Sequence, residues 1–273
     1  MAHSLEERFR AALVKTDVLL PTLPESTQRV LAAFRPDSTA ASIAKAVETD
    51  GPLSARALKL ANSAFYKGAA PARTVTQAVV RVGMSSVHNL VQAEAQKPLY
   101  AAHDPRARAY LGKLWQHAIA AAVAAQDVAQ KTRAAEPAVA FLGGLLHDVG
   151  KTALLPLLPF KEGQEWPPEG ELEVVHCTAG QLLLARWNIP GDLRAAVASH
   201  HAPASAGPNQ KLAATVALAN GLCHLVGLAP VPAPGVLAAL PGWSKALGLD
   251  DADVAQLAEA LSARVAQMDA ILG

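Results

Sequence analysis

The sequence predicts an all-helical protein, and two observations support that prediction. Alanine and leucine, both strong helix formers, dominate the 273-residue chain, whereas the alternation of β-branched and polar residues that marks strands is scarce. Apolar residues instead recur three and four positions apart, which is the spacing of one helix face. Hydrophobic residues make up 51% of the chain and charged residues 17%, so we expect the helices to pack around a buried core.

N-cap residues and prolines indicate where several of the predicted helices begin. Asp37-Ser38-Thr39 offers an N-cap to the helix that follows it. Asp50 caps the next helix and Pro52 fits its first turn, where the missing N–H costs nothing. The last helix is expected to begin at Asp250 or Asp251. Helical stripes of apolar residues occur at 5–13, 30–34, 43–47, 53–61, 76–83, 111–121, 172–183, 193–200 and 254–268.

The stretch around Asp104-Pro105 indicates a boundary between two helical halves. We predict subdomains of residues 1–100 and 101–273 on either side of it. Clusters of proline, glycine and polar residues predict exposed loops at 159–170, 202–209 and 229–235.

Composition excludes several classes of function. The 24 basic and 23 acidic residues give a formal net charge of +1, so the protein has no large positive charge that would attract nucleic acid. Aromatic residues make up 4% of the chain, too few for a platform that stacks bases. The chain shows neither a run of about 18 apolar residues nor a signal-peptide pattern, and its two cysteines make no disulfide framework. We expect a cytoplasmic protein that binds neither membranes nor nucleic acid.

The run His147-Asp148-Val149-Gly150-Lys151 is the most informative part of the chain. It follows the apolar residues 139–146, where an ionisable pair is costly to bury without compensation. A metal ion would compensate the pair, and several inward histidines with an aspartate on different helices are how helical metal sites are built. Each histidine taken alone also fits a core residue that is hydrogen-bonded to a carbonyl. The further candidate ligands are His117, His176, His200 and His201.

Two neighbours of these residues need separate interpretation. Lys151 lies four residues after His147 and shares its helix face if the helix continues through Gly150. Beside a metal it would meet a phosphate or carboxylate; otherwise it is a surface lysine or the partner of a local acid. Cys177 follows His176, but adjacent helical residues point about 100° apart, so we do not expect both to bind one ion.

The motifs in both halves resemble the HDOD domain. The N-terminal half carries Leu20-Pro-Thr-Leu-Pro24, Asp50-Gly-Pro-Leu53, Ala61-Asn-Ser-Ala-Phe-Tyr66 and Ala78-Val-Val-Arg-Val-Gly83. The second half carries Trp115-Gln-His117, Gly144-Leu-Leu-His-Asp-Val-Gly-Lys151, Trp187-Asn-Ile-Pro190 and His200-His201. The resemblance covers residues 20–225, approximately. It implies an N-terminal helical subdomain packed on a core similar to that of HD phosphohydrolases, and a bacterial signalling or regulatory role in which catalysis is not established.

The ligand pattern is also similar to that of HD-GYP domains, relatives that cleave cyclic dinucleotides with two metal ions. This similarity implies a metal centre formed by His117, His147, Asp148, His176, His200 and His201, and Lys151 matches the lysine of these enzymes. The chain departs from them at two places. Asn220, a neutral and weaker ligand, stands where they have an aspartate, and Ala202-Pro203-Ala204 replaces their Gly-Tyr-Pro.

Two functions follow from these residues. The first is a regulatory HDOD module without turnover, which holds one or two divalent ions (Fe, Mn, Zn or Ni) and acts on a signalling protein partner, with a nucleotide as a further ligand. The second is a metal-dependent phosphohydrolase or phosphodiesterase acting on a nucleotide or cyclic dinucleotide. In that case Asp148 and Lys151 would be catalytic residues. Neither function requires an organic cofactor.

Overall fold

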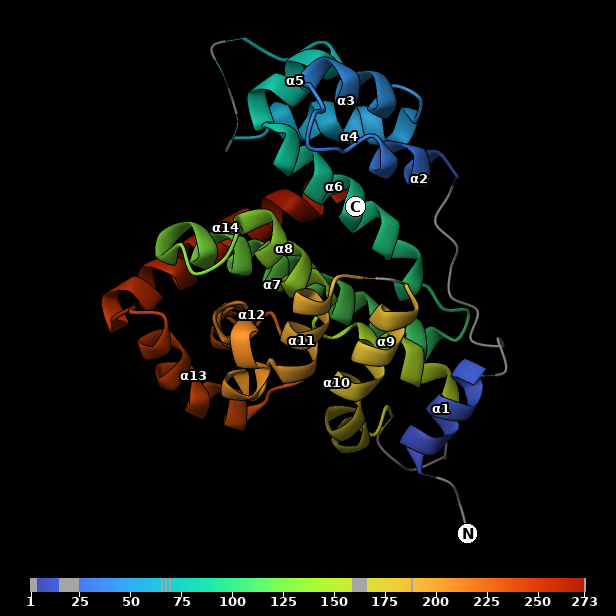
Figure 1. Cartoon of the computed structure of the whole chain (residues 1–273), viewed down its shortest axis with the longest axis vertical. Coiled ribbons are helices and arrows are strands. Elements are labelled where there is room, and N and C mark those ends of the chain that lie inside the picture. The colour runs from blue at the N-terminus through green and yellow to red at the C-terminus, as the bar shows by residue number, and fades with distance from the viewer. Residues whose placement is uncertain are drawn as a thin grey trace. The chain divides into compact units, whose positions relative to one another are not determined.

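The computed structural model describes residues 4–14, 25–64, 66, 68, 70–158, 166–187 and 189–272. These residues form helices and no strand (Figure 1), which confirms the predicted all-helical class. Residues 20–24, Phe65, 159–165 and Asn188, which entered the sequence analysis, lie outside the described part of the chain.

The described helices fall into two compact units, which we call the small unit and the large unit. The small unit contains the described residues of 21–98 and of 263–273. Its helices are α2 (Glu25–Ala32), α3 (Ala40–Val47), α4 (Gly51–Ala61), α5 (Val75–Val82), α6 (Met84–Gln96) and the end of α14 (Asp251–Leu272).

The predicted N-caps of the small unit are confirmed. The Thr39 hydroxyl accepts a hydrogen bond from the Ser42 N–H at 3.2 Å, and the Ser42 hydroxyl accepts one from the Thr39 N–H at 3.0 Å. The Asp50 carboxylate accepts from the Leu53 N–H at 3.0 Å, with Pro52 in the first turn of α4. These side chains satisfy N–H groups that have no partner inside a helix, and they fix where α3 and α4 begin.

The large unit contains the described residues of 1–20 and of 99–262. The short 3₁₀ helix η1 (Lys97–Tyr100) spans the point in the sequence where the chain passes from the small unit to the large unit. Its elements, besides most of α14, are α1 (Leu5–Val14), α7 (Pro105–Thr132), α8 (Pro137–Leu146), α9 (Val149–Leu154), η2 (Leu155–Leu157), α10 (Glu169–Arg186), α11 (Gly191–Ser199), η3 (Pro203–Asn209), α12 (Gln210–Leu225) and α13 (Pro234–Ala246).

The compact units differ from the predicted subdomains at both chain ends. Helix α1 packs against α9 and α10 of the large unit, and Arg8 Nη1 donates to the Leu157 carbonyl at 2.7 Å. The end of α14 groups with the small unit instead. These contacts join residues far apart in the sequence, so no local pattern encodes them. The subdomains 1–100 and 101–273 stay a prediction.

Helix α7 forms the middle of the large unit. It begins at Pro105 with the Asp104 carboxylate as its N-cap, and its second half is an almost continuous run of buried alanines, 118–125. Small side chains allow α8 to approach closely. A Cβ atom at Gly144 of α8 would lie 2.8 Å from the Ala122 Cα, so a glycine is required where these helices meet.

A second close crossing joins α9 to α10. A Cβ atom at Gly150 would overlap the His176 carbonyl oxygen and would lie 2.6 Å from the Gly180 nitrogen. The two backbones therefore touch, and the start of α9 lies directly against the middle of α10. This contact brings the segment that begins α9 beside the side chains of α10, as described below.

All three predicted loops include helical residues in the structure, and the segment 159–170 ends in the first turn of α10. Residues 203–209 form η3, interrupted by Gly207 at φ 57°, and the segment 229–235 ends in the first turn of α13. In both cases a proline occupies the first helical turn, where it does not break a helix. These prolines mark the starts of helices, although the same residues also occur in loops.

Residues Pro137–Leu157 are the one stretch, among the described residues, that is long and apolar enough to cross a membrane. Of its most apolar window, 78% is buried inside the protein. The stretch comprises α8, α9 and η2 and carries the polar run that begins at His147. It forms part of the core of the large unit.

We predict that Gly150→Ala lowers the free energy of unfolding by about 3 kcal/mol, because α9 and α10 must separate to accommodate the methyl group. Urea unfolding followed by circular dichroism measures the change. Gly112→Ala is the matched control, since a Cβ atom at Gly112 of α7 meets nothing within 4 Å. This substitution should raise the free energy of unfolding by up to about 1 kcal/mol. Equal urea midpoints for the two variants would refute the close crossing.

Candidate metal centre

The site is built around the break between α8 and α9. Helix α8 ends at Leu146, and Asp148, with φ −103° and ψ 9°, leaves the helical conformation before α9 begins. The helix therefore does not continue from His147 through Gly150. Both His147 and Asp148 remain buried, with 0% and 3% of their surface exposed, because the apolar α8 carries them into the core of the large unit.

Four buried histidines place their Nδ1 atoms against backbone carbonyl oxygens. A carbonyl oxygen only accepts hydrogen bonds, so each Nδ1 carries the ring hydrogen and each Nε2 keeps a free lone pair. This is the arrangement by which proteins orient imidazole ligands for metals. The pairs are His117 with Leu228 at 3.1 Å, His147 with Gly144 at 2.7 Å, His176 with Leu172 at 3.0 Å and His200 with Val197 at 2.8 Å.

The free Nε2 atoms of these rings face one another. The Nε2 atoms of His117 and His147 are 3.1 Å apart. The Nε2 atom of His176 lies 3.4 Å from that of His200 and 3.2 Å from that of His201. In the pairs His117–His147 and His176–His200, two lone pairs at this distance are satisfied by a proton or a cation between them, and by no hydrogen bond between the neutral rings. The residues present therefore fit a metal ion.

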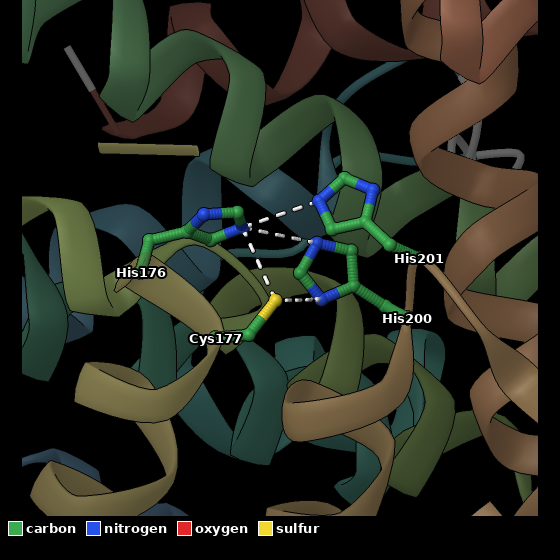
Figure 2. Close-up of side chains that lie close together, drawn as sticks. All are labelled: His176, Cys177, His200 and His201. Atoms are coloured by element: carbon green, nitrogen blue, oxygen red, sulfur yellow. Dashed lines mark hydrogen bonds between the residues drawn. The ribbon is translucent and has the colours of Figure 1, made fainter. Parts of the chain in front are cut away.

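Asp148 lies between the two sets of histidines. Its Oδ2 atom is 3.6 Å from His147 Nε2 and 3.8 Å from His117 Nε2. Its Oδ1 atom is 3.2 Å from His176 Nε2. The structure thus forms a first group of His117, His147 and Asp148, and a second group of His176, Cys177, His200 and His201 (Figure 2), with the ligand atoms of each group within 4.8 Å of one another.

The charges of these residues suit metal ligands. Burial lowers the pKa of His117 to about 3, and burial likewise lowers the pKa values of His147 and His200. Burial opposes the ionisation of Asp148, but Lys151 and the facing histidines outweigh it and hold the pKa of this carboxyl well below its usual value. Neutral imidazoles and an ionised carboxylate are the forms that bind divalent ions.

Lys151 is buried and surrounded by carboxylates. Its Nζ atom lies 2.5 Å from Glu173, 3.3 Å from Glu169 and 3.2 Å from Asp148. Burial disfavours the ammonium form, yet these carboxylates raise the pKa of Lys151 well above its usual value. The sequence left three roles open for Lys151: binding a phosphate or carboxylate, lying at the surface, or pairing with a local acid. The contacts in the structure agree with pairing to local acids.

Glu169 and Glu173 also belong to the site, although the sequence motifs did not predict them. They lie on α10 seven and three residues before His176, which places all three on one face of that helix. Tyr110 of α7 also donates its hydroxyl hydrogen to Glu169, at 2.9 Å from Oε2. The helical spacing of the two acids from His176 is the feature of the sequence that could have identified them as neighbours of the site.

Asn220 of α12 faces the same site. It is 3% exposed, and its Oδ1 atom has no hydrogen-bond partner among the described residues. It lines a small cavity together with His117, Asp148 and His224, of about 10 Å³, which is room for about one water molecule. The amide oxygen of this cavity-lining residue is orphaned, so it is a further group that a cation would satisfy. His224 also belongs to the lining.

The structure places the Cys177 sulfur beside the His176 ring, closer than the helix geometry suggested, while joint metal binding by the two residues stays untested. Its Sγ atom lies 3.4 Å from His176 Nε2, although the two residues are adjacent on α10 (Figure 2). The angle of about 100° between neighbouring helical residues describes the Cα–Cβ bonds. The imidazole ring reaches far enough from the helix for its Nε2 atom to meet the neighbouring sulfur.

Comparisons with known proteins agree with this architecture. A crystal structure of an HDOD domain protein of unknown function from Geobacter sulfurreducens has a TM-score of 0.70 and is 25% identical, over 98% of each chain. A Shewanella amazonensis SB2B protein named as a candidate phosphohydrolase has a TM-score of 0.70 and is 26% identical, over 96% of this chain and 98% of its own.

A curated but uncharacterized protein of Treponema pallidum (strain Nichols) is 28% identical over 217 residues. The match covers 74% of this chain but 41% of that protein, so the chain spans about two fifths of this relative's length. The family model of the HDOD domain matches residues 20–203, which is more than half of the chain. The fold, the order of the motifs and this match together place the chain in the HDOD domain family.

Proposed function

We propose that the protein is a regulatory HDOD module that holds divalent metal ions in the large unit and does not turn over a substrate. The observation that carries this proposal is the set of facing Nε2 atoms, 3.1 to 3.4 Å apart. In four of these histidines, His117, His147, His176 and His200, the Nδ1 atom is committed to a carbonyl group. A cation between two such lone pairs would satisfy both of them.

The residues divide into two sets of ligands. His117, His147 and Asp148 would hold one ion, with the Asn220 amide oxygen at the same cavity. His176, His200 and His201 would hold a second ion. Imidazole and carboxylate donors suit Fe, Mn, Zn or Ni, and an ion bound there would acidify a coordinated water and polarise a phosphoryl oxygen.

Three features support a role without turnover. Asn220 supplies a neutral amide where a carboxylate would bind metal more strongly. Lys151 is engaged by Glu169 and Glu173 and is not free to hold a phosphate. The cavity over the ligands has room for about one water molecule, far less than a nucleotide requires.

A module of this kind acts through other molecules. We propose a signalling protein as the partner and a nucleotide as a further ligand, in agreement with the family's role in bacterial signalling. We also propose a cytoplasmic location, because both cysteines are free thiols and free thiols are typical of reducing compartments.

The second candidate function is a metal-dependent phosphohydrolase or phosphodiesterase. The observation that favours it is the position of Asp148, which lies within 3.9 Å of histidine nitrogens of both groups and would bridge two ions. The name of the Shewanella neighbour supports the same chemistry. In this case Asp148 would position the ions, and Lys151 would have to leave its glutamate partners to bind a phosphate.

We predict that His147→Ala weakens metal binding at the first group, because a ligand is lost. Loss of a residue that only supports a ligand costs roughly 10–100-fold in metal affinity, and loss of the ligand itself should cost more. Calorimetric titration of the chelator-treated full chain with Zn²⁺ and Mn²⁺ measures the affinity. His103→Ala, at an exposed histidine, is the control and should bind as the wild type does. Equal affinities for the two variants would contradict the proposed centre.

We predict that Asn220→Asp tightens metal binding by about tenfold, since an ionised carboxylate replaces an amide, without producing hydrolysis of phosphodiesters. Calorimetry and a chromogenic phosphodiester assay test the two parts. Asn209→Asp adds the same charge at the start of α12 and should leave the affinity unchanged. Turnover in Asn220→Asp would show a catalytic site that lost its aspartate, and would favour the second candidate function.

We predict that the metal-free protein loses stability as the pH falls from about 6.5 toward 3. The pKa of His117 is about 3 in the folded protein and 6.5 in its ordinary state, so the unfolded chain binds a proton there that the folded protein does not. The free energy of unfolding then falls with decreasing pH, by about 1.4 kcal/mol per pH unit at most for this group.

Urea unfolding between pH 7.5 and 5 in the presence of a chelator measures this dependence. His117→Asn should give a shallower dependence than the wild type, because the titrating group is gone. His103→Ala should follow the wild-type curve. A His117→Asn curve as steep as that of the wild type would show that burial of this histidine does not control the acid sensitivity.

A further inference from the structure

The second group contains a sulfur atom as well as three imidazoles (Figure 2). The Cys177 Sγ atom lies 3.4 Å from His176 Nε2 and 3.7 Å from His200 Nδ1. The His200 Nδ1 atom donates to the Val197 carbonyl, so the contact that bears on metal binding is the one with His176 Nε2. That nitrogen is therefore surrounded by three other candidate ligand residues, His200, His201 and Cys177.

The distances around His176 Nε2 match the edges of a tetrahedral zinc site. With Zn–N of about 2.05 Å and Zn–S of about 2.3 Å, two nitrogens of a tetrahedron lie about 3.3 Å apart and a nitrogen and a sulfur about 3.6 Å apart. The structure has 3.4 Å to His200 Nε2, 3.2 Å to His201 Nε2 and 3.4 Å to Cys177 Sγ. All three agree with the ideal edges to about 0.2 Å.

The other cysteine provides a contrast within the same chain. Cys223 lies on α12 and is fully buried among apolar residues of that helix. Among the described residues it belongs to neither group of candidate ligands. Cys177 is partly accessible and its sulfur contacts the imidazoles of His176 and His200, so the position of the sulfur is specific to this site.

We propose that Cys177 is a thiolate ligand of the ion in the second group, which makes that site one of three imidazoles and one sulfur. Binding replaces the thiol hydrogen by the metal, and the proton leaves to solvent. A sulfur ligand favours zinc over manganese, whereas the first group offers nitrogen and oxygen only. Four protein ligands around a tetrahedral ion leave no position open for substrate, as in structural zinc sites.

This inference rests on the proposed function, because it requires that the second group binds metal. Co²⁺ is a suitable probe, since a thiolate bound to Co²⁺ gives a charge-transfer absorption band in the near ultraviolet that imidazole and carboxylate ligands do not give. The full chain is compared with Cys177→Ser and with Cys223→Ser, the matched control. Total bound metal is measured by elemental analysis on the same samples.

We expect the wild type and Cys223→Ser to show the band, and Cys177→Ser to lack it while it still binds metal at the first group. We also expect Cys177→Ser to bind Zn²⁺ at the second group at least about tenfold more weakly. In the unaltered protein, bound Zn²⁺ should protect one thiol from a thiol-reactive disulfide, and the protected residue identified by mass spectrometry should be Cys177.

The outcomes separate the two proposals. Metal binding without the band, together with an unprotected Cys177, would overturn the sulfur ligand and leave the proposed function intact. A chain that binds neither Co²⁺ nor Zn²⁺ would overturn the proposed function itself. The thiol-protection measurement uses the unaltered protein, so it decides the matter even where Cys177→Ser fails to fold.

Discussion

The buried carboxylate of Asp148 is the group on which the site depends. A carboxylate at 3% exposure is stable only if positive charge or hydrogen-bond donors surround it. Lys151 supplies the charge at 3.2 Å, and the imidazoles of both groups turn their Nε2 atoms toward the same carboxylate. Removal of this carboxylate would leave a buried ammonium short of one partner and two groups of histidines without the residue that connects them.

The backbone makes this arrangement possible at two glycines. Gly144 lets α8 lie against the alanines of α7, which carries His117. Gly150 lets α9 touch α10 beside the carbonyl of His176. A side chain at either glycine would separate helices that each carry a ligand. The short distances between nitrogens are thus a consequence of helix packing, and the fold and the site are constrained together.

The sequence predicted the helical class, the N-caps and the histidines and aspartate that meet at the site, because these predictions depend on local spacing and short motifs. Inward-facing stripes identify His176 and His200 without knowledge of the tertiary structure. The roles of Glu173 and Cys177 depend instead on where side-chain ends meet, which requires the packing of α9 on α10. The grouping of α1 with the large unit depends on contacts distant in sequence, such as that of Arg8 with Leu157.

The charge of the cavity explains why a cation fits it better than a free phosphate. Its lining includes the carboxylates of Asp148, Glu169 and Glu173 against the single ammonium of Lys151, while the histidines there are neutral, which leaves a formal charge of −2. An anionic substrate would be repelled by this net negative charge. One divalent ion would balance them. Under the proposed function, metal binding would therefore precede any interaction of this pocket with a phosphate group.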